Sequence, residues 1–172
     1  MKRADFDTYI RRFNAEETGA FEDYMAPGVR MLNGTLLLRG VEEVKAHYAK
    51  IWGAMRESLN VERFVSDATT VAIQMHTHFE VRRDDPASPF GAIRAGETFD
   101  YHGLIMYRLR ADGKFEDIKV AYLSFIYTDL DGTLFGPGSL SVCHAPNEFV
   151  PVDELIDCCK AIALAMAAWA GR

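Results

Sequence analysis

The chain has 172 residues, of which 49% are hydrophobic and 26% are charged, and its formal net charge is −6. This is the composition of an ordinary globular protein, and the length indicates a single domain. An acidic chain without a basic patch argues against nucleic acid as a partner. The longest apolar run, residues 161–170, is too short to span a membrane.

The chain has three cysteines, Cys143, Cys158 and Cys159. An odd number that includes an adjacent pair does not indicate a disulfide framework. The first residues contain no apolar segment of the kind found in secretory signals. We therefore expect a cytoplasmic protein with reduced cysteines.

The N-terminal part of the chain predicts helices over 5–16 and 17–26, because apolar residues recur there at helical spacing. A short hairpin follows, with Asn33 and Gly34 as its two-residue turn. Helical spacing then returns over 41–59. Strands are predicted beyond this point, and they cover residues 61–65, 70–83, 97–109 and 114–129.

The rest of the chain has a different character. A Gly/Pro-rich crossing leads to an amphipathic helix over 152–169. We expect a domain over residues 1–128 and a C-terminal extension, 129–172, that belongs to the same globule.

Four stretches carry a resemblance to a known family: "FDTYIRRFNAEETGAFEDYMAPGVRM", "RGVEEVKAHYAKIW", "VSDATTVAIQMH" and "YRLRADGKFEDIKVAYLSF". The chain resembles the SnoaL-like and ketosteroid-isomerase-like proteins of the nuclear transport factor 2-like superfamily over residues 5–128. The resemblance implies an α+β fold, a cystatin-like cone in which N-terminal helices pack on a curved antiparallel sheet, here with a C-terminal helical extension. Its members include isomerases, dehydratases, epoxide hydrolases and polyketide cyclases, so the resemblance implies the fold more strongly than the reaction.

The two longest predicted strands can be placed in register. With Asp112 and Gly113 as the turn, Tyr107 lies opposite Ile118, and Tyr101 lies opposite Ser124. These residues share the concave face with Ile105, Gly103, Val120 and Tyr122. The other face carries His102, Leu104, Met106, Ala121, Leu123, Phe125 and Tyr127. Since both faces are apolar, we expect a homodimer through the outer face.

The stretch "MHTHFE", residues 75–80, alternates strictly. We predict that Val71, Ile73, Met75, Phe79 and Val81 join the outer face, which directs Gln74, His76, His78 and Glu80 into the cone. The same alternation also allows the opposite phase, in which the histidines face water. A metal site is the third possibility, with His76, His78 and Glu80 as ligands. Three such positions on one strand extend over about 13 Å, which is wide for one ion, so we expect no metal.

The resemblance also allows site residues to be compared. Tyr9 lies where the isomerases have their oxyanion-binding tyrosine, whereas their general base falls at Asn33 and their second acid falls near Ile105. Because Asn cannot abstract a proton and Ile cannot donate one, ketosteroid isomerase activity is not expected.

The leading hypothesis is a cofactor-independent lyase, isomerase or polyketide-cyclase-type enzyme that acts on an apolar, oxygenated small molecule in the cone. The predicted catalytic residues are His76, His78, Glu80 and Tyr101. The predicted substrate-binding residues are Tyr9, Asn33, Tyr48, Trp52, Gln74, Tyr107 and Tyr122. The alternatives are a non-catalytic ligand-binding or homodimeric interaction protein and, third, a metal-dependent oxygenase.

Overall fold

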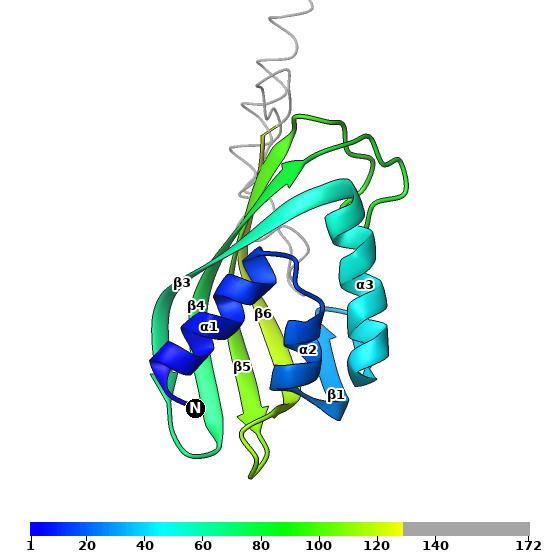
Figure 1. Ribbon diagram of the computed structural model, residues 1–172. Coiled ribbons are helices and arrows are strands. Elements are labelled where there is room, and N and C mark those ends of the chain that lie inside the picture. Colours follow the sequence, from blue (N-terminus) through cyan, green and yellow to red (C-terminus); the bar gives the residue numbers. More distant parts are fainter. Residues whose placement is uncertain (129–172) are drawn as a thin grey trace, which may run out of the picture.

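The computed structural model describes residues 1–128. These residues form three helices and six strands, most of which are labelled in Figure 1. They are α1 (Arg3–Asn14), α2 (Gly19–Tyr24), β1 (Met25–Asn33), β2 (Leu36–Arg39), α3 (Gly40–Ala54), β3 (Met55–Ser66), β4 (Thr70–Val81), β5 (Thr98–Leu109) and β6 (Phe115–Thr128). None of these three helices is long and apolar enough to cross a membrane. The predicted helix over 152–169 lies outside the described residues.

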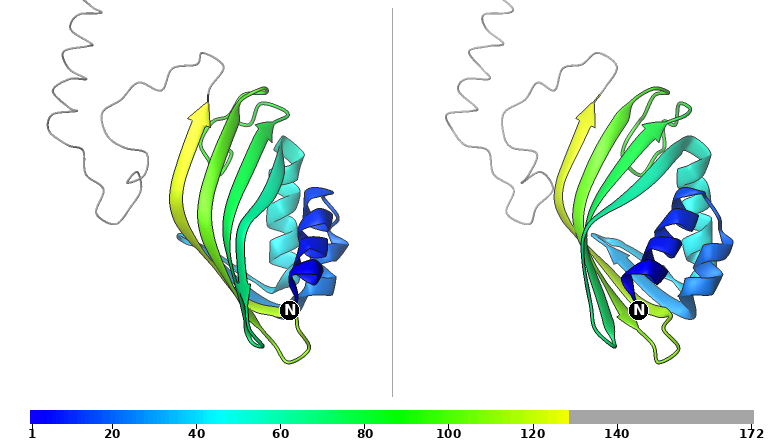
Figure 2. Two further views of the ribbon diagram at one scale, coloured as in Figure 1. Left: turned by 90° about the vertical axis from the view of Figure 1, so that its left-hand side faces the viewer. Right: turned by 60° about the vertical axis from the view of Figure 1, so that its left-hand side comes forward.

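The strands form one curved sheet in the order β2-β1-β6-β5-β4-β3. All neighbouring strands are antiparallel except β1 and β6, which are parallel, so the sheet is mixed. The helices lie against one face of the sheet, and in the described part of the chain the opposite face bears no helix (Figure 2). The expected α+β cone is therefore confirmed. We call the helix-covered face the inner face and the opposite one the outer face.

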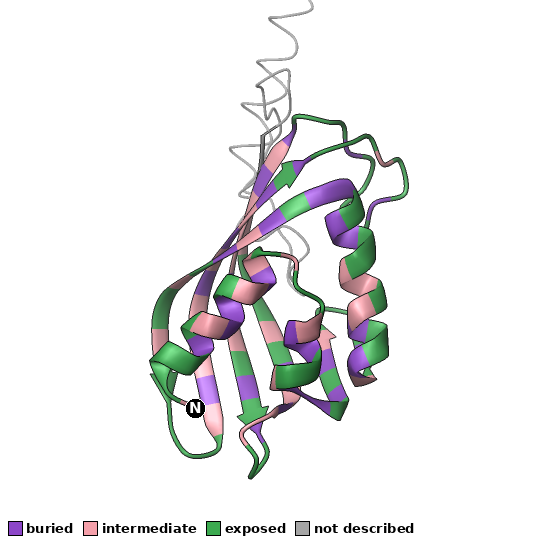
Figure 3. Ribbon diagram, viewed as in Figure 1, coloured by how far each residue is buried: buried purple, intermediate pink, exposed green. Residues whose placement is uncertain are grey.

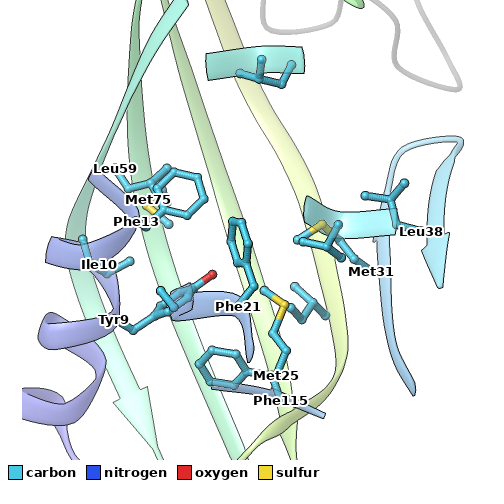
Figure 4. Close-up of a cluster of buried hydrophobic side chains, with 14 of the residues drawn as sticks. Tyr9, Ile10, Phe13, Phe21, Met25, Met31, Leu38, Leu59, Met75 and Phe115 are labelled. Atoms are coloured by element: carbon cyan, nitrogen blue, oxygen red, sulfur yellow. The ribbon is translucent and has the colours of Figure 1, made fainter. Parts of the chain in front are cut away.

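The core fills the space between the inner face and the helices. Burial alternates along the strands, as Figure 3 shows, because successive side chains point to opposite faces. Each fully buried Phe, Met or Ile side chain stabilises the fold by about 1.5–3 kcal/mol. The largest members, several of them labelled in Figure 4, are Phe6, Phe13, Phe21, Met25, Met55, Met75, Phe99, Phe115 and Ile118.

The predicted phase of β4 is wrong. Val71, Ile73, Met75 and Phe79 are buried in the core beneath the helices, so they lie on the inner face. The reason is the pairing with β5, where Val71 lies directly opposite Tyr107. Directly opposed residues of antiparallel strands share a face, and Tyr107 is buried in the same core. The even-numbered residues of β4 therefore face outward.

The predicted register between β5 and β6 is confirmed from Tyr107, opposite Ile118, to Gly103, opposite Tyr122. Next to the turn it is wrong by one residue, because Leu109 lies opposite Phe115 and an irregularity follows between Arg108 and Leu109. An irregularity between His102 and Gly103 then shifts the pairing by one residue, so that Tyr101 lies opposite Phe125 and not Ser124. Such a bulge inserts one extra residue into one strand and reverses its phase. As a result Phe125 packs against the core and does not face outward.

Two predicted boundaries also differ. Asn33 pairs with Leu36, so the hairpin turn is Gly34-Thr35, with Gly34 in the left-handed region at φ 57°. Helix α3 ends at Ala54, five residues before the predicted end, and β3 begins at once. Met55 and Leu59, which fit a helical stripe, are instead buried positions of a strand.

Candidate functional site

A buried carboxyl group lies on the inner face at the start of β3. The strand alternates from Met55 onward, so Glu57 points inward between two buried apolar neighbours, directly opposite Phe79. The Glu57 residue is only 7% exposed. Burial raises its pKa from the ordinary 4.5 to about 8, with no other cause. The group is therefore mostly protonated at neutral pH and close to its titration midpoint.

Two buried tyrosines, Tyr9 and Tyr48, interact electrostatically with this carboxyl group. The pKa of the Tyr9 hydroxyl is raised by burial and further by the charge of Glu57. The pKa of the Tyr48 hydroxyl is raised as well, mainly by burial and next by the charge of Glu57. The pKa of the Tyr107 hydroxyl is raised mainly by burial and, to a smaller extent, by the charge of Tyr9. These hydroxyl groups therefore stay neutral and are able to donate hydrogen bonds.

Two buried donors face this interior without a partner among the described residues: the indole Nε1 of Trp52 and the hydroxyl of Tyr101. Trp52 lies beside Tyr48, with 5.6 Å between the ring centroids, which connects it to the tyrosines near Glu57. Burial raises the pKa of Tyr101 to about 12. A buried donor without an acceptor is unfavourable, so an oxygen atom bound beside either group would relieve it.

Strand β6 extends beyond the end of its pairing with β1. The pairing of β1 with β6 ends at Val120, opposite Asn33. Beyond that point Tyr122 is 36% exposed, and its ring lies 5.8 Å from that of Tyr101. The half-buried Tyr101 thus has its ring beside the partly exposed Tyr122, while its hydroxyl is buried.

The outer face holds a separate polar cluster. Asp100 Oδ1 lies 2.6 Å from His76 Nε2 and 2.8 Å from His78 Nδ1, so both imidazoles share one carboxylate oxygen. Partial burial acts to raise the pKa of Asp100, but the hydrogen bonds to the two histidines outweigh it and leave that pKa below its usual value. His102 stacks on His76 with 4.7 Å between ring centroids. The ligand atoms of His76, His78 and Asp100 all lie within 4.8 Å of one another, so the cluster could hold a metal ion.

A comparison with protein families matches the SnoaL-like domain to residues 6–118, which is more than half of the chain. The chain belongs to the SnoaL-like domain family. No curated protein is similar enough to the chain to count as a match.

Solved structures share the fold of this SnoaL-like protein. One is a provisionally assigned polyketide cyclase from Xanthomonas campestris pv. campestris, 21% identical, with a TM-score of 0.58, covering 68% of this chain and 86% of its own. A SnoaL-like polyketide cyclase from Agrobacterium tumefaciens is 16% identical, with a TM-score of 0.55 over 70% of this chain and 91% of its own. An epoxide hydrolase from M. tuberculosis is 9% identical, with a TM-score of 0.55, and the match covers 68% of this chain and 78% of its own. At these identities the likeness concerns the fold alone.

The structure divides the predicted site residues of this SnoaL-like protein between the two faces. Those that lie on the inner side of the sheet or in the core are Tyr9, Tyr48, Trp52, Tyr101, Tyr107 and Tyr122. Those on the outer face are Gln74, His76, His78 and Glu80, so their predicted inward orientation is wrong. Gln74 donates a hydrogen bond to Glu62 at 2.7 Å. Asn33 is exposed at the end of β1 and does not line the interior.

Sequence reasoning missed Glu57 as a site residue. The predicted helical stripe over 41–59 did not include it. The alternation of Met55, Glu57 and Leu59, with Arg56 and Ser58 between, was the available signal. A strand of that phase directs a carboxyl group inward.

Proposed function

We propose that this SnoaL-like protein is a cofactor-independent enzyme that moves protons on an apolar, oxygenated small molecule bound inside the cone, with Glu57 as its acid–base group. The observation that carries this proposal is the burial of Glu57, which holds its pKa at about 8. A general acid or base works best when its pKa lies near the working pH.

The interior offers both parts of such a reaction. Protonated Glu57 can donate to a substrate oxygen, and its carboxylate can remove a proton next to a carbonyl group. Trp52 Nε1 and the Tyr101 hydroxyl, both buried without a described partner, can donate hydrogen bonds to the oxygen on which charge develops. The neutral tyrosines beside Glu57 can orient the substrate.

The walls of the interior indicate the kind of molecule. Rings of Phe13, Phe21 and Trp52 pack within 6.0 Å of one another, and they favour a flat, apolar molecule. The fold neighbours include a polyketide cyclase and an epoxide hydrolase. Ring closure and epoxide opening both transfer a proton to or from oxygen, which is the chemistry proposed for Glu57.

The test measures proton exchange, which needs no knowledge of the final product. Apolar cyclic ketones are incubated with the protein in deuterated water, and deuterium uptake beside the carbonyl group is followed by mass spectrometry. We expect uptake with the wild type and its loss in Glu57→Gln. Glu62→Gln, an exposed change of the same type on β3, is the matched control. Equal uptake in wild type and Glu57→Gln would contradict the proposal.

A non-catalytic binding function is the second candidate. The observation that favours it is the same pair of unpartnered donors, Trp52 Nε1 and the Tyr101 hydroxyl, which suits a bound oxygen whether or not it reacts. A computationally designed 17-OHP binder has this fold, at 18% identity and a TM-score of 0.55 over 76% of this chain and 94% of its own. Binding without turnover predicts that ketones bind to the wild type and to Glu57→Gln with equal affinity, and that neither protein exchanges protons.

We further propose that the outer face pairs with a second copy of the chain. Leu104 and Met106 are 46% and 47% exposed there, and they line a shallow hollow of about 440 Å³ together with Ala72 and Ala121. Large apolar side chains that remain exposed side by side on a sheet favour burial in an interface.

A further inference from the structure

We propose that the outer face of the sheet carries a binding site for a divalent transition-metal ion, formed by His76, His78 and Asp100. Two imidazole nitrogens and one carboxylate oxygen are a donor set that suits Zn²⁺. This inference is independent of the function proposed for Glu57, which lies on the inner face.

The sheet brings the three donors together. His76 and His78 are two residues apart on β4, and therefore share a face. Asp100 on β5 lies directly opposite His78. The third donor thus comes from the neighbouring strand, which removes the difficulty that three positions along β4 alone are too widely spread. The third ligand of the proposed site is therefore Asp100, and not Glu80 as considered from the sequence.

The spacing of the donors fits a metal after a small movement. Zn²⁺ with bonds of about 2.0–2.1 Å in a tetrahedral site separates neighbouring ligand atoms by about 3.3 Å. The two histidine nitrogens now lie 2.6 and 2.8 Å from Asp100 Oδ1. An opening of less than about 1 Å at each of these two contacts would admit the ion, and the two histidine nitrogens already lie within 4.8 Å of one another. Rotation of the Asp100 carboxylate supplies a movement of this size, since the group is on the surface side of the strand.

The surroundings of the cluster also suit a metal ligand. The second ring nitrogen of His78, Nε2, lies 3.8 Å from Glu80 Oε1. The proton between His78 Nδ1 and Asp100 is displaced when an ion binds, and Glu80 then lies on the side of the proton that remains on Nε2. The stacked ring of His102 fixes the plane of His76. The side chains of the three ligands are 29–33% exposed, so an ion can reach them and keep water as a further ligand.

The experiment titrates the full-length, tag-free protein with zinc chloride at pH 7.5 by isothermal calorimetry. We expect the wild type to bind one more equivalent of zinc than His76→Gln and Asp100→Asn do. The matched control is His47→Gln, which removes a half-buried histidine from α3. The three cysteines are present in every variant, so they cannot account for a difference between them. Circular dichroism confirms that each variant is folded.

Three further results separate the outcomes. Glu80→Gln should weaken zinc binding by about tenfold while retaining the stoichiometry, as expected for a group that orients a ligand. Glu57→Gln should leave zinc binding unchanged, so failure of the acid–base proposal would not affect this one. The site does not exist if folded His76→Gln and Asp100→Asn bind zinc as the wild type does, or if the wild type binds none.

Discussion

The ring of Tyr101 lies directly over Gly103, two residues further along β5. A Cβ atom at position 103 would be 2.7 Å from Tyr101 Cε1, closer than real Cβ contacts come, and 3.1 Å from its hydroxyl oxygen, which is tighter than most. Gly103 therefore provides the space in which the Tyr101 hydroxyl reaches its buried position. This relationship connects the sheet backbone with one of the two donors of the proposed site.

Replacing Gly103 with alanine should displace the ring of Tyr101. The new methyl group would also lie 3.0 Å from the backbone oxygen of Ala121, so it has little space on either side. We expect a loss of about 1–3 kcal/mol in the free energy of unfolding, measured by urea denaturation, because a packed site resists added volume. Proton exchange should fall at the same time.

A double variant checks this explanation. If the Tyr101 ring is the obstacle, Gly103→Ala should be much less harmful when Tyr101→Ala is also present. The two changes should then depart from additivity by about 1 kcal/mol or more. Strict additivity would show that the ring is not what Gly103 accommodates.

The stability of the protein should depend on pH through Glu57. Its folded-state pKa of about 8 exceeds the ordinary 4.5, so the folded protein binds this proton more tightly than the unfolded chain does. The associated stability is present below about pH 4.5 and is lost as pH rises toward 8. Glu57→Gln removes this loss, so relative to wild type it should gain roughly 2–5 kcal/mol between pH 4.5 and 8.5. Urea denaturation across this range provides the measurement, and parallel curves for the two proteins would contradict the burial of a titrating group.

Removal of the Tyr101 hydroxyl should affect function more than folding. This hydroxyl is buried without a described partner, so Tyr101→Phe should leave stability unchanged or raise it by about 1 kcal/mol. The same variant should show weaker proton exchange, because it has lost a donor to the substrate oxygen. Thermal denaturation and the deuterium assay provide the two readings. A clear loss of stability would mean that the hydroxyl is satisfied within the folded protein.

A charge on the outer face should disrupt pairing of two copies. Leu104→Lys places an ammonium group in the apolar hollow, and burying it in an interface without a partner is unfavourable. Light scattering after size-exclusion chromatography should then give the monomer mass, whereas the wild type gives the dimer mass. Ala46→Lys, an exposed position on α3, is the control for added charge and should remain dimeric. A dimeric Leu104→Lys variant would place the interface elsewhere.

The cone fold and most of the register between β5 and β6 could be predicted from the sequence. Tyr107 lies opposite Ile118 as predicted, although the turn itself differs: Leu109 lies opposite Phe115, and an irregularity between Arg108 and Leu109 restores the predicted pairing. The shift beyond Gly103 was not predictable, since a bulge has no periodic signature. The family assignment agrees with the resemblance over nearly the same residues.

The site was harder to predict because alternation defines two faces without saying which one is inside. For β4 the argument from an uncovered outer face chose the wrong side, and the apolar residues Met75 and Phe79 belong to the core. Pairing Val71 with Tyr107 would have given the correct phase. Glu57 was missed for a related reason, since Met55 and Leu59 fit a helix as well as a strand. Because α3 ends at Ala54, these residues belong to a strand and not to a helix.

The most direct test of the account is a carbon-13 NMR titration of the glutamate side-chain carboxyl carbons. The Glu57 resonance is assigned by its absence from Glu57→Gln. The account predicts that this resonance titrates with a midpoint near pH 8, because the carboxyl group is buried inside the cone. A midpoint near the ordinary value of 4.5 would show a solvated carboxylate and would contradict the acid–base role proposed for Glu57.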